Sequence, residues 1–349
     1  MLRVLPCLIL GMFLASCANI SILNQKNKSE ELNKVGYRPG VGVEFTPPEI
    51  ASKEEPPRIR TEETVDILDG KVFVEEKDEK THSNKINPRK IKLGLILGPG
   101  LSRSVGHISV LRSIERSGTK VDFVSGSEMG AIIGAMYATG MTPEMIEWNF
   151  YKYYREKSNA KVFSPKWIEE IDEHFLKRFQ NVRVEKLKKY FYVPLYSKKV
   201  KKVVFFNKGN LRNLLILNLK TRTQSPTLEY TNASEYEVFT SSFMRSAGAE
   251  VIVGIDALGD KVSLKDSNEF LYGVYQRFIG NIKKDKKSVD LYFPLPLDNS
   301  FLDSDEDAGA NLQNASDYAQ KIIIEIDKKR ELKAKAQENV SQNCENGCV

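Results

Sequence analysis

The distribution of apolar and polar positions separates a polar first quarter from a region of regular apolar runs that begins near residue 91. The run Lys92–Leu97 is continuously apolar after its lysine, as in a buried strand. Residues 108–117 repeat apolar positions at helical spacing. Residues 121–140 then hold a second short strand, a tight turn and an apolar helix that a glycine closes. This β-α-β-α order predicts an α/β fold of three layers, a mainly parallel sheet with helices on both faces.

Residues 142–335 predict further helices and strands of the same α/β domain. Thr142-Pro143 and Ser164-Pro165 each predict a helix start, with the hydroxyl residue as N-cap and proline at the first helical position. Further strands are expected at Val203–Phe206 and Val251–Ile255, and a long amphipathic helix at Asn311–Lys335. We therefore expect one domain over residues 91–335 and a polar tail over 336–349.

The first residues predict export. A short basic segment is followed by an apolar run that ends at Leu14, too short to span a bilayer comfortably. The run leads into Leu14-Ala-Ser-Cys17, which resembles a bacterial lipoprotein signal. We expect residues 1–16 to be removed and Cys17 to carry acyl chains that anchor the protein in the membrane. The alternative is a plain secretory signal with a chance cysteine.

Residues 17–90 are polar, charged and interrupted by prolines, which predicts a tether between the membrane and the domain. Asp69-Gly70 lies between two apolar runs, as in a short hairpin. No later stretch is apolar enough for a second anchor. The expected location is the bacterial cell envelope, on the periplasmic or outer-membrane face.

Charge and cysteine content restrict the partners only slightly. The net charge is +6, and no nucleic-acid motif accompanies it. Lysines cluster at 198–202 and 283–287, where they either touch anionic lipid or are solvated. Cys344 and Cys348 form a disulfide or remain two exposed thiols; without a nearby histidine they do not predict a metal site. We expect no cofactor.

The turn inside residues 121–140 carries the most informative pattern. Gly126-Ser127-Glu128-Met129-Gly130 has the spacing of a nucleophile elbow, G-x-S-x-G, in which the central residue is presented to substrate on a sharp strand-to-helix bend. The central position holds Glu128 instead of serine. The scaffold of an esterase has therefore lost its nucleophile.

Three stretches together resemble the patatin-like phospholipases. The loop after the first strand has glycines and a basic residue, Gly98, Gly100 and Arg103, before a helix near His107. The second stretch is the elbow, and the third is Gly248–Asp256, which resembles a late strand of that family. The resemblance covers most of residues 92–330 and implies the patatin-like α/β fold.

In that family an elbow serine is served by an aspartate on a D-G turn, and the glycine-rich loop donates N–H groups to the oxyanion. Here the serine position is Glu128, and an ungapped count from Gly248 puts the aspartate position at Asn232. The loop is interrupted by Pro99, which has no N–H. The resemblance therefore implies a degenerate member with no intact catalytic residue.

Several residues have more than one interpretation. Glu128 suits the first turn of a helix, and its carboxylate could occupy the position of the oxyanion. Ser127 is the alternative nucleophile, although it would face a different direction from the elbow residue. Arg103 either holds an anionic head group or balances the charge of the loop. His107 is expected to be structural.

The preferred function is non-catalytic: binding of lipid or an envelope protein through the former acyl cleft, at a membrane reached through Cys17. One alternative is an active acyl hydrolase, a phospholipase or esterase that uses a shifted serine. Another is a structural spacer in the envelope.

Overall fold

The structure is a computed structural model that describes residues 91–259, 262, 264, 268–297 and 308–347. The predicted signal (1–16), the acylation site Cys17, the tether (17–90) with its hairpin, and Cys348 lie outside the described residues. No helix in the described part of the chain combines the length and the apolar character needed to cross a bilayer.

The strands are β1 (Leu93–Leu97), β2 (Phe123–Gly126), β3 (Tyr190–Ser197), β4 (Lys202–Phe206), β5 (Tyr230–Asn232), β6 (Val251–Asp256) and β7 (Leu291–Pro294). The α-helices are α2 (Gly106–Ser117), α3 (Met129–Thr139), α4 (Pro143–Glu156), α5 (Pro165–Ile171), α6 (Leu211–Asn218), α7 (Ser241–Ser246), α8 (Glu269–Asp285) and α9 (Ala308–Gly347). Short 3₁₀ or π turns lie at Leu101–Val105, Asp172–Leu176, Lys177–Phe179, Val184–Lys186 and Ala233–Glu235.

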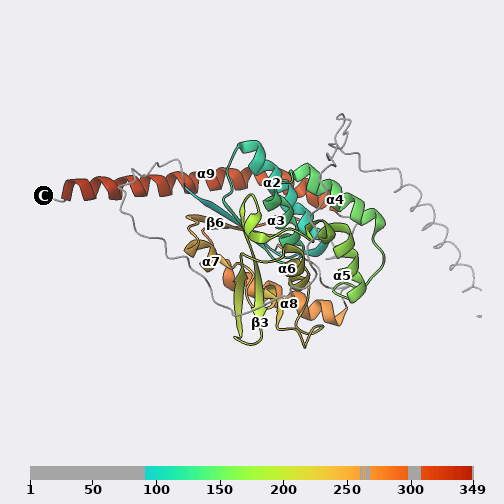
Figure 1. Cartoon of the computed structure of the whole chain (residues 1–349). Helices are drawn as coiled ribbons and strands as arrows, with labels where there is room; N and C mark the ends of the chain where they lie inside the picture. Colours follow the sequence, from blue (N-terminus) through green and yellow to red (C-terminus); the bar gives the residue numbers. More distant parts are fainter. Residues whose placement is uncertain (1–90, 260–261, 263, 265–267, 298–307, 348–349) are drawn as a thin grey trace, which may run out of the picture. The chain divides into compact units, whose positions relative to one another are not determined.

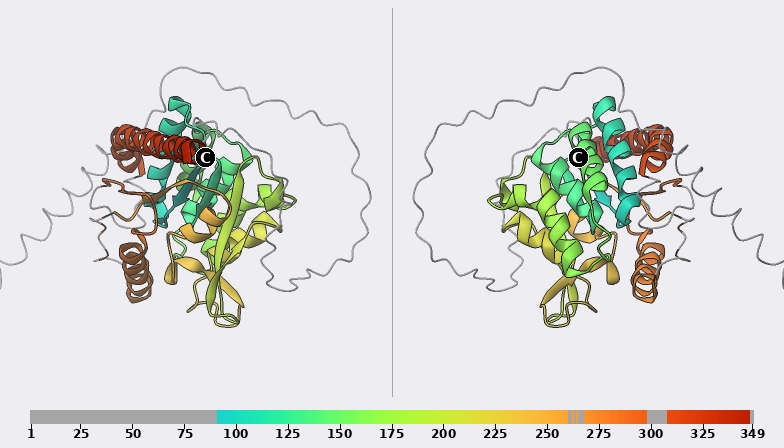
Figure 2. Two further views of the ribbon diagram at one scale, coloured as in Figure 1. Left: turned by 90° about the vertical axis from the view of Figure 1, so that its left-hand side faces the viewer. Right: turned by 90° about the vertical axis from the view of Figure 1, so that its right-hand side faces the viewer.

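The strands form one sheet in the order β4-β3-β2-β1-β6-β7, with β5 also paired to β3. The five strands from β3 to β7 along this order are parallel, while β4 and β5 pair antiparallel with β3. Helices α2 and α9 lie on one face of the sheet, and α7 and α8 lie on the other (Figures 1 and 2). The α/β class with a mainly parallel sheet between two helical layers is confirmed.

Burial explains why these segments fold as they do. All five residues of β1 are buried, as expected for a strand covered on both faces. The predicted caps are present: the Thr142 hydroxyl accepts a hydrogen bond from Met145 N at 3.3 Å, and the Ser164 hydroxyl accepts one from Trp167 N at 3.2 Å. These two caps fix the starts of α4 and α5.

Other elements differ from the sequence prediction. The last helix begins at Ala308 and continues to Gly347, so residues 336–347 of the expected tail are helical and Cys344 lies within α9. The sequence pattern also did not reveal β3, which lies inside the sheet and contains Pro194. Proline usually argues against an inner strand, but β3 pairs with β2 only at Tyr190–Tyr192, before Pro194.

The parallel order brings two loops together at one edge of the sheet. Because β1 and β2 are neighbours and parallel, the loops that follow them leave from the same edge. Ser127 N donates to Leu97 O at 3.0 Å, and Gly98 N donates to Ile255 O at 2.8 Å. These bonds place the glycine-rich loop against the turn that contains Glu128.

Candidate active site

Glu128 occupies the bend between β2 and α3 with a backbone that side chains rarely adopt. Its φ is 56° and its ψ is −126°. The two glycines around it are needed for close approach: a Cβ on Gly130 would lie 2.4 Å from Gly98 O, and a Cβ on Gly126 would lie 2.7 Å from Gly130 O. The turn therefore has the strained geometry that the G-x-S-x-G spacing predicts, with glutamate at its centre.

The Glu128 side chain points into the protein and is fully buried. Its Oε2 atom accepts hydrogen bonds from Gly100 N at 2.7 Å and Leu101 N at 3.1 Å. Its Oε1 atom accepts one from the Tyr275 hydroxyl at 2.8 Å. One carboxylate thus joins the turn, the glycine-rich loop and α8, and its two oxygens each have a donor.

The two N–H groups on Oε2 are the donors that the glycine-rich loop has available. Gly98 N is used by Ile255 O, and Pro99 has no N–H. Leu101 has a φ of 46°, so its backbone is strained like that of Glu128, with which it is in direct contact. Adjacent backbone N–H groups of this kind bind anions in enzymes, including oxyanions of acyl transfer. In this protein the Glu128 carboxylate takes the place of such an anion.

Burial changes the protonation of two groups beside this loop. It raises the pKa of Glu128 to about 7, and the hydrogen bonds from Leu101, Gly100 and Tyr275 oppose that rise only in part. It also lowers the pKa of His107 to about 4, against the opposing effect of its bond to Gly98 O at 2.9 Å. A carbonyl only accepts, so His107 Nε2 carries the hydrogen and His107 is a neutral residue that holds the loop.

Asn232 lies at the end of β5 and is also fully buried. Its Nδ2 donates to Asn218 O at 2.6 Å, and its Oδ1 accepts from Ser234 N at 2.7 Å. The Asn218 amide in turn donates to Glu128 O at 3.4 Å. Asn232, at the position expected for the aspartate, is therefore connected to the elbow backbone through Asn218. Its own side chain does not bond to the Glu128 carboxylate.

The other two predicted residues, Arg103 and Ser127, differ in their contacts. Arg103 is fully buried, and its guanidinium donates to Ala257 O and Leu258 O, each at 3.0 Å. This ties the glycine-rich loop to the end of β6 and leaves no surface for a head group. Ser127 Oγ is buried and has no hydrogen-bond partner among the described residues. Among the described residues, no histidine or carboxylate is hydrogen-bonded to Ser127 Oγ.

Two residues of the site were not found by sequence reasoning. Tyr275 lies on α8 and Asn218 at the end of α6, and neither carries a motif. Tyr275 is fully buried and stacks on Phe163 with 6.3 Å between ring centroids. Helical spacing on α8 marks Tyr275 as a core position, but only the fold brings its hydroxyl to Glu128.

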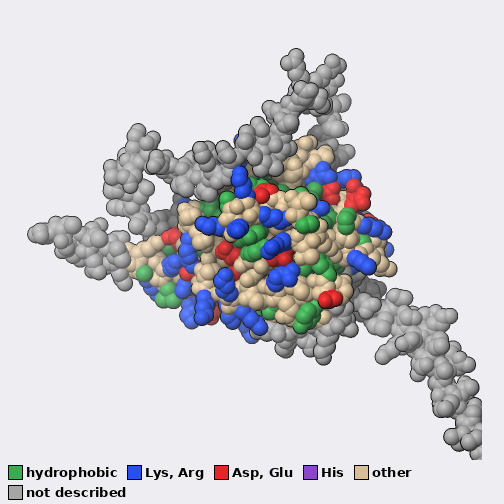
Figure 3. Space-filling view, turned by 90° about the horizontal axis from the view of Figure 1, so that it is seen from below, with side chains coloured by type: hydrophobic (Ala, Val, Ile, Leu, Met, Phe, Trp, Pro, Cys, Tyr) green, Lys and Arg blue, Asp and Glu red, His purple; other side chains and the backbone are tan. Residues whose placement is uncertain are grey.

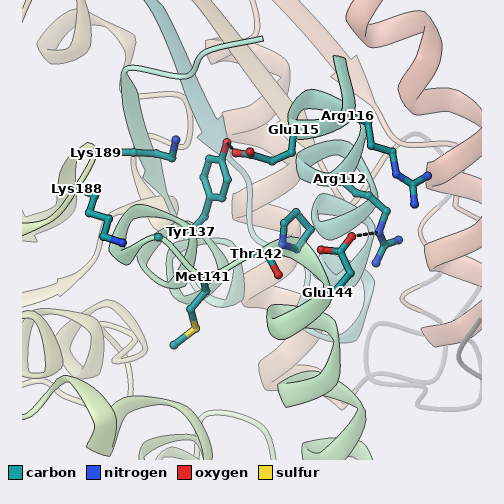
Figure 4. Close-up of a pocket in the computed structure, with 11 residues that line it drawn as sticks. Arg112, Glu115, Arg116, Tyr137, Met141, Thr142, Glu144, Lys188 and Lys189 are labelled. Atoms are coloured by element: carbon teal, nitrogen blue, oxygen red, sulfur yellow. Dashed lines mark hydrogen bonds and ion pairs between the residues drawn. The ribbon is translucent and has the colours of Figure 1, made fainter. Parts of the chain in front are cut away.

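A separate surface pocket lies at the opposite end of α3 (Figure 4). Its volume is about 540 Å³. Arg112, Arg116, Lys188 and Lys189 line it together with Glu115, Tyr137, Gly140, Met141, Thr142, Pro143 and Glu144. Arg112 Nε pairs with Glu144 at 3.2 Å, so part of the positive charge is neutralised internally. Since α3 is a helix of 11 residues, this pocket is about 16 Å from the elbow.

The lysine clusters occupy other surfaces. Residues 198–201 form the turn between β3 and β4, and Lys202 begins β4. Residues 283–287 include the last residues of α8 and the two that follow it. The face seen from below in Figure 3 carries many Lys and Arg side chains among acidic and apolar groups. Lys198 Nζ donates to Ser225 O at 2.7 Å and Pro226 O at 2.8 Å, so one member of the first cluster holds a loop. Within the described ranges, no group of three or more His, Cys, Asp or Glu side chains is placed to hold a metal ion.

Comparison with known proteins agrees with this geometry. Residues 95–254 match the sequence model of the family described as patatin-like phospholipase. The match covers 160 of the 349 residues, so this segment is similar to that family. The matched segment contains the glycine-rich loop, the elbow with Glu128, and Asn232. The matched segment includes Gly100 and Leu101, which donate to the Glu128 carboxylate, whereas Tyr275 lies outside it.

The similar curated proteins are much longer than this chain. A segment of 161 residues is 27% identical to lysophospholipase NTE1 of Scheffersomyces stipitis, which covers 42% of this chain and 10% of that protein. A segment of 46 residues is 44% identical to lysophospholipase NTE1 of Yarrowia lipolytica, covering 13% of this chain and 3% of that protein. The chain thus matches a tenth or less of the length of these relatives.

Two solved structures are similar at low identity. VipD from Legionella pneumophila is 9% identical with a TM-score of 0.40, and the match covers 68% of this chain and 67% of VipD. The type III effector ExoU is 12% identical with a TM-score of 0.36, and the match covers 69% of this chain and 54% of ExoU.

Proposed function

We propose that this protein is a lipid-anchored envelope protein whose patatin-like domain binds lipid or an envelope protein without hydrolysing an ester. The observation that supports this proposal is the position of the Glu128 carboxyl group. It stands at the apex where the acyl-enzyme would form, and it accepts the two loop N–H groups that an oxyanion would need. A glutamate at the apex and loop donors that are already bonded to it support a site without acyl transfer.

Access to the site is also closed. Ser127, Glu128, Asn232 and Tyr275 each have a relative exposure of 2% or less. A substrate carbonyl would have to displace both Tyr275 and the internal carboxylate before it reached the loop N–H groups. This arrangement disfavours our expectation that ligands bind in the former acyl cleft, and we place binding on the surface of the domain instead.

The alternative hydrolase with a shifted serine lacks a supporting contact. Nucleophilic serine requires a base within hydrogen-bond reach. Ser127 Oγ has no partner among the described residues, and Ser125 Oγ donates to Tyr192 O at 3.2 Å. Neither hydroxyl is connected to a histidine or a carboxylate in the described part of the chain.

The proposal is tested with the purified full-length chain. We expect no cleavage of a p-nitrophenyl ester and no labelling by a fluorophosphonate probe, with an active patatin-like hydrolase as positive control. Glu128→Ser should remain inactive, because the Asn232 side chain bonds to Asn218 and Ser234 and no aspartate serves position 128. Turnover or labelling that Ser127→Ala abolishes would establish the shifted-serine hydrolase.

A second measurement separates binding from a purely structural role. Phospholipid vesicles that bind the native domain raise its melting temperature, because ligand binding to the folded state stabilises it. A protein that acts only as a spacer should melt at the same temperature with and without vesicles. Appreciable esterase activity in Glu128→Ser alone would show that our account of the site is wrong.

A further inference from the structure

Helix α4 has two apolar sides, of which only one is used by the fold. Its inner side places Ile146, Phe150 and Tyr153 in the core, with relative exposures of 0%, 2% and 3%. Its outer side exposes Met145 at 41% and Trp148 at 49%. Exposing an aromatic side chain as large as Trp148 to water is unfavourable in free energy, and such a residue often marks a contact surface.

The outer side of α4 combines these apolar groups with cations. Trp148 stacks on Tyr151, with 5.4 Å between ring centroids and 22° between the planes. Lys152 Nζ lies 5.5 Å from the centroid of the Trp148 ring, and the Arg155 guanidinium lies 5.6 Å from that of Tyr151. We call Met145, Trp148, Tyr151, Lys152 and Arg155 the α4 outer stripe.

The positive charges of this stripe are not neutralised by carboxylates. Neither Lys152 nor Arg155 has an acidic partner among the described residues; each cation faces an aromatic ring. The acidic residues on the same helix pair with cations of other elements. Glu144 and Glu147 bond to Arg112.

The third acid of the helix, Glu156, is paired more weakly. It lies 3.9 Å from His174 Nδ1, a contact that is an ion pair only when the histidine is protonated. The outer stripe therefore presents two cations and two aromatic rings to its surroundings, with one exposed carboxylate at its end.

The geometry of the stripe fits a flat surface. Residues 145, 148, 152 and 155 follow the i, i+3, i+7, i+10 spacing of one side of a helix and span about 15 Å along its axis. A protein interface is usually depleted of lysine at its centre, whereas a helix that lies on a membrane combines tryptophan with lysine and arginine. Tryptophan and tyrosine rings concentrate at the level of lipid head groups.

We infer that the α4 outer stripe docks onto a membrane surface that contains anionic phospholipid. Lys152 and Arg155 contact the phosphate groups, while Trp148 and Met145 enter the head-group region. The inference rests on the proposed function, because an acylated Cys17 keeps the domain next to such a surface. It adds the contact surface and the lipid class to that function.

The two tryptophans of the chain allow a direct test. Trp148 is half-exposed, whereas Trp167 is buried with a relative exposure of 4%. The full-length chain with Cys17→Ser is mixed with vesicles of phosphatidylcholine, with and without phosphatidylglycerol. We expect the Trp148 emission to shift to shorter wavelength and to be quenched by brominated lipid only with phosphatidylglycerol. Trp148→Phe should remove both signals, since only Trp167 remains.

Charge variants separate the stripe from other basic surfaces. Lys152→Gln with Arg155→Gln should lower the affinity for phosphatidylglycerol vesicles by roughly 30-fold, because each Lys or Arg near an anionic surface contributes about fivefold. The matched control is Lys283→Gln, in the last turn of α8, with Lys287→Gln, just after that helix, which should change the affinity less than about twofold. Tyr272→Ala, a similarly exposed aromatic at 49% on α8, is the apolar control.

Several results would overturn the inference. Vesicle binding without a Trp148 shift would place the contact elsewhere, for example in the N-terminal residues. An equal loss of affinity in the α8 lysine variant would show that total charge, not the stripe, determines binding. No binding to phosphatidylglycerol vesicles, together with retention of an acidic envelope protein that Trp148→Phe releases, would assign the stripe to a protein partner. Lipid hydrolysis, followed in the same samples, would refute the non-catalytic proposal without affecting the docking result.

Discussion

Replacing Glu128 with glutamine should make the protein more stable at pH 8 and leave its stability nearly unchanged at pH 4.5. Burial raises the Glu128 pKa from its ordinary value of 4.5 to about 7. Since one pKa unit corresponds to about 1.4 kcal/mol, ionising this buried group costs the folded protein about 3 kcal/mol. Glutamine has nearly the same shape, can accept the loop N–H bonds through its oxygen, and never ionises.

The direction of the effect follows from proton binding. Between pH 4.5 and about 7 the unfolded chain releases the Glu128 proton while the native protein retains it. The free energy of unfolding therefore falls as the pH rises through this window, and above it the full cost remains. The difference between Glu128→Gln and wild type should grow from near zero to about 3 kcal/mol and then stay constant.

His107 acts in the opposite direction in the same pH range. Its pKa is lowered from 6.5 to about 4, so the stability that a neutral His107 provides is lost as the pH falls through 4. In the wild type the two contributions largely cancel between pH 4.5 and 6.5. Glu128→Gln removes the Glu128 contribution and leaves that of His107. The free energy of unfolding of this variant should therefore rise with pH by about 3 kcal/mol over this interval.

The assay is urea unfolding followed by far-ultraviolet circular dichroism at several pH values from 4 to 8. Glu331→Gln, a substitution of an exposed glutamate on α9, is the matched control and should differ from wild type by a constant small amount. A Glu128→Gln difference that does not change with pH would refute the reasoning. So would a variant less stable than wild type at pH 8, since the charge would then stabilise the fold.

Two further predictions concern the same turn. Gly130→Ala should destabilise the domain by roughly 3 kcal/mol or more in thermal or urea unfolding, because its Cβ would lie 2.4 Å from Gly98 O; Gly280→Ala, in open space on α8, should be neutral or stabilise by up to ~1 kcal/mol. Equal stability of the two variants would contradict the close approach at the elbow. Tyr275→Phe removes the hydroxyl that donates to Glu128 Oε1, so it should cost about 2 kcal/mol at pH 8, where the carboxylate is ionised, and less at pH 5. A loss that is the same at both pH values would argue for a packing effect alone.

The sequence determined the local features of this protein. The spacing of Gly126, Glu128 and Gly130 was enough to predict a strand-to-helix bend, because the motif lies within five consecutive residues. The close approach of Gly130 to Gly98 O came only with the tertiary structure. The N-caps Thr142 and Ser164 were readable for the same reason: the hydroxyl and the N–H that it accepts are three residues apart. The order of apolar runs likewise indicated a parallel sheet.

Only the tertiary structure decided what the glutamate does. Tyr275 is 147 residues from Glu128 in the chain, and the loop N–H groups are 27 and 28 residues away. No periodicity records such contacts, because they depend on which strands become neighbours and on which helix covers the bend. The direction of the Asn232 amide was likewise hidden, since it is set by Asn218, a buried partner on another element. A motif determines the backbone position of a side chain, whereas packing in the interior determines the hydrogen-bond partners of its polar atoms.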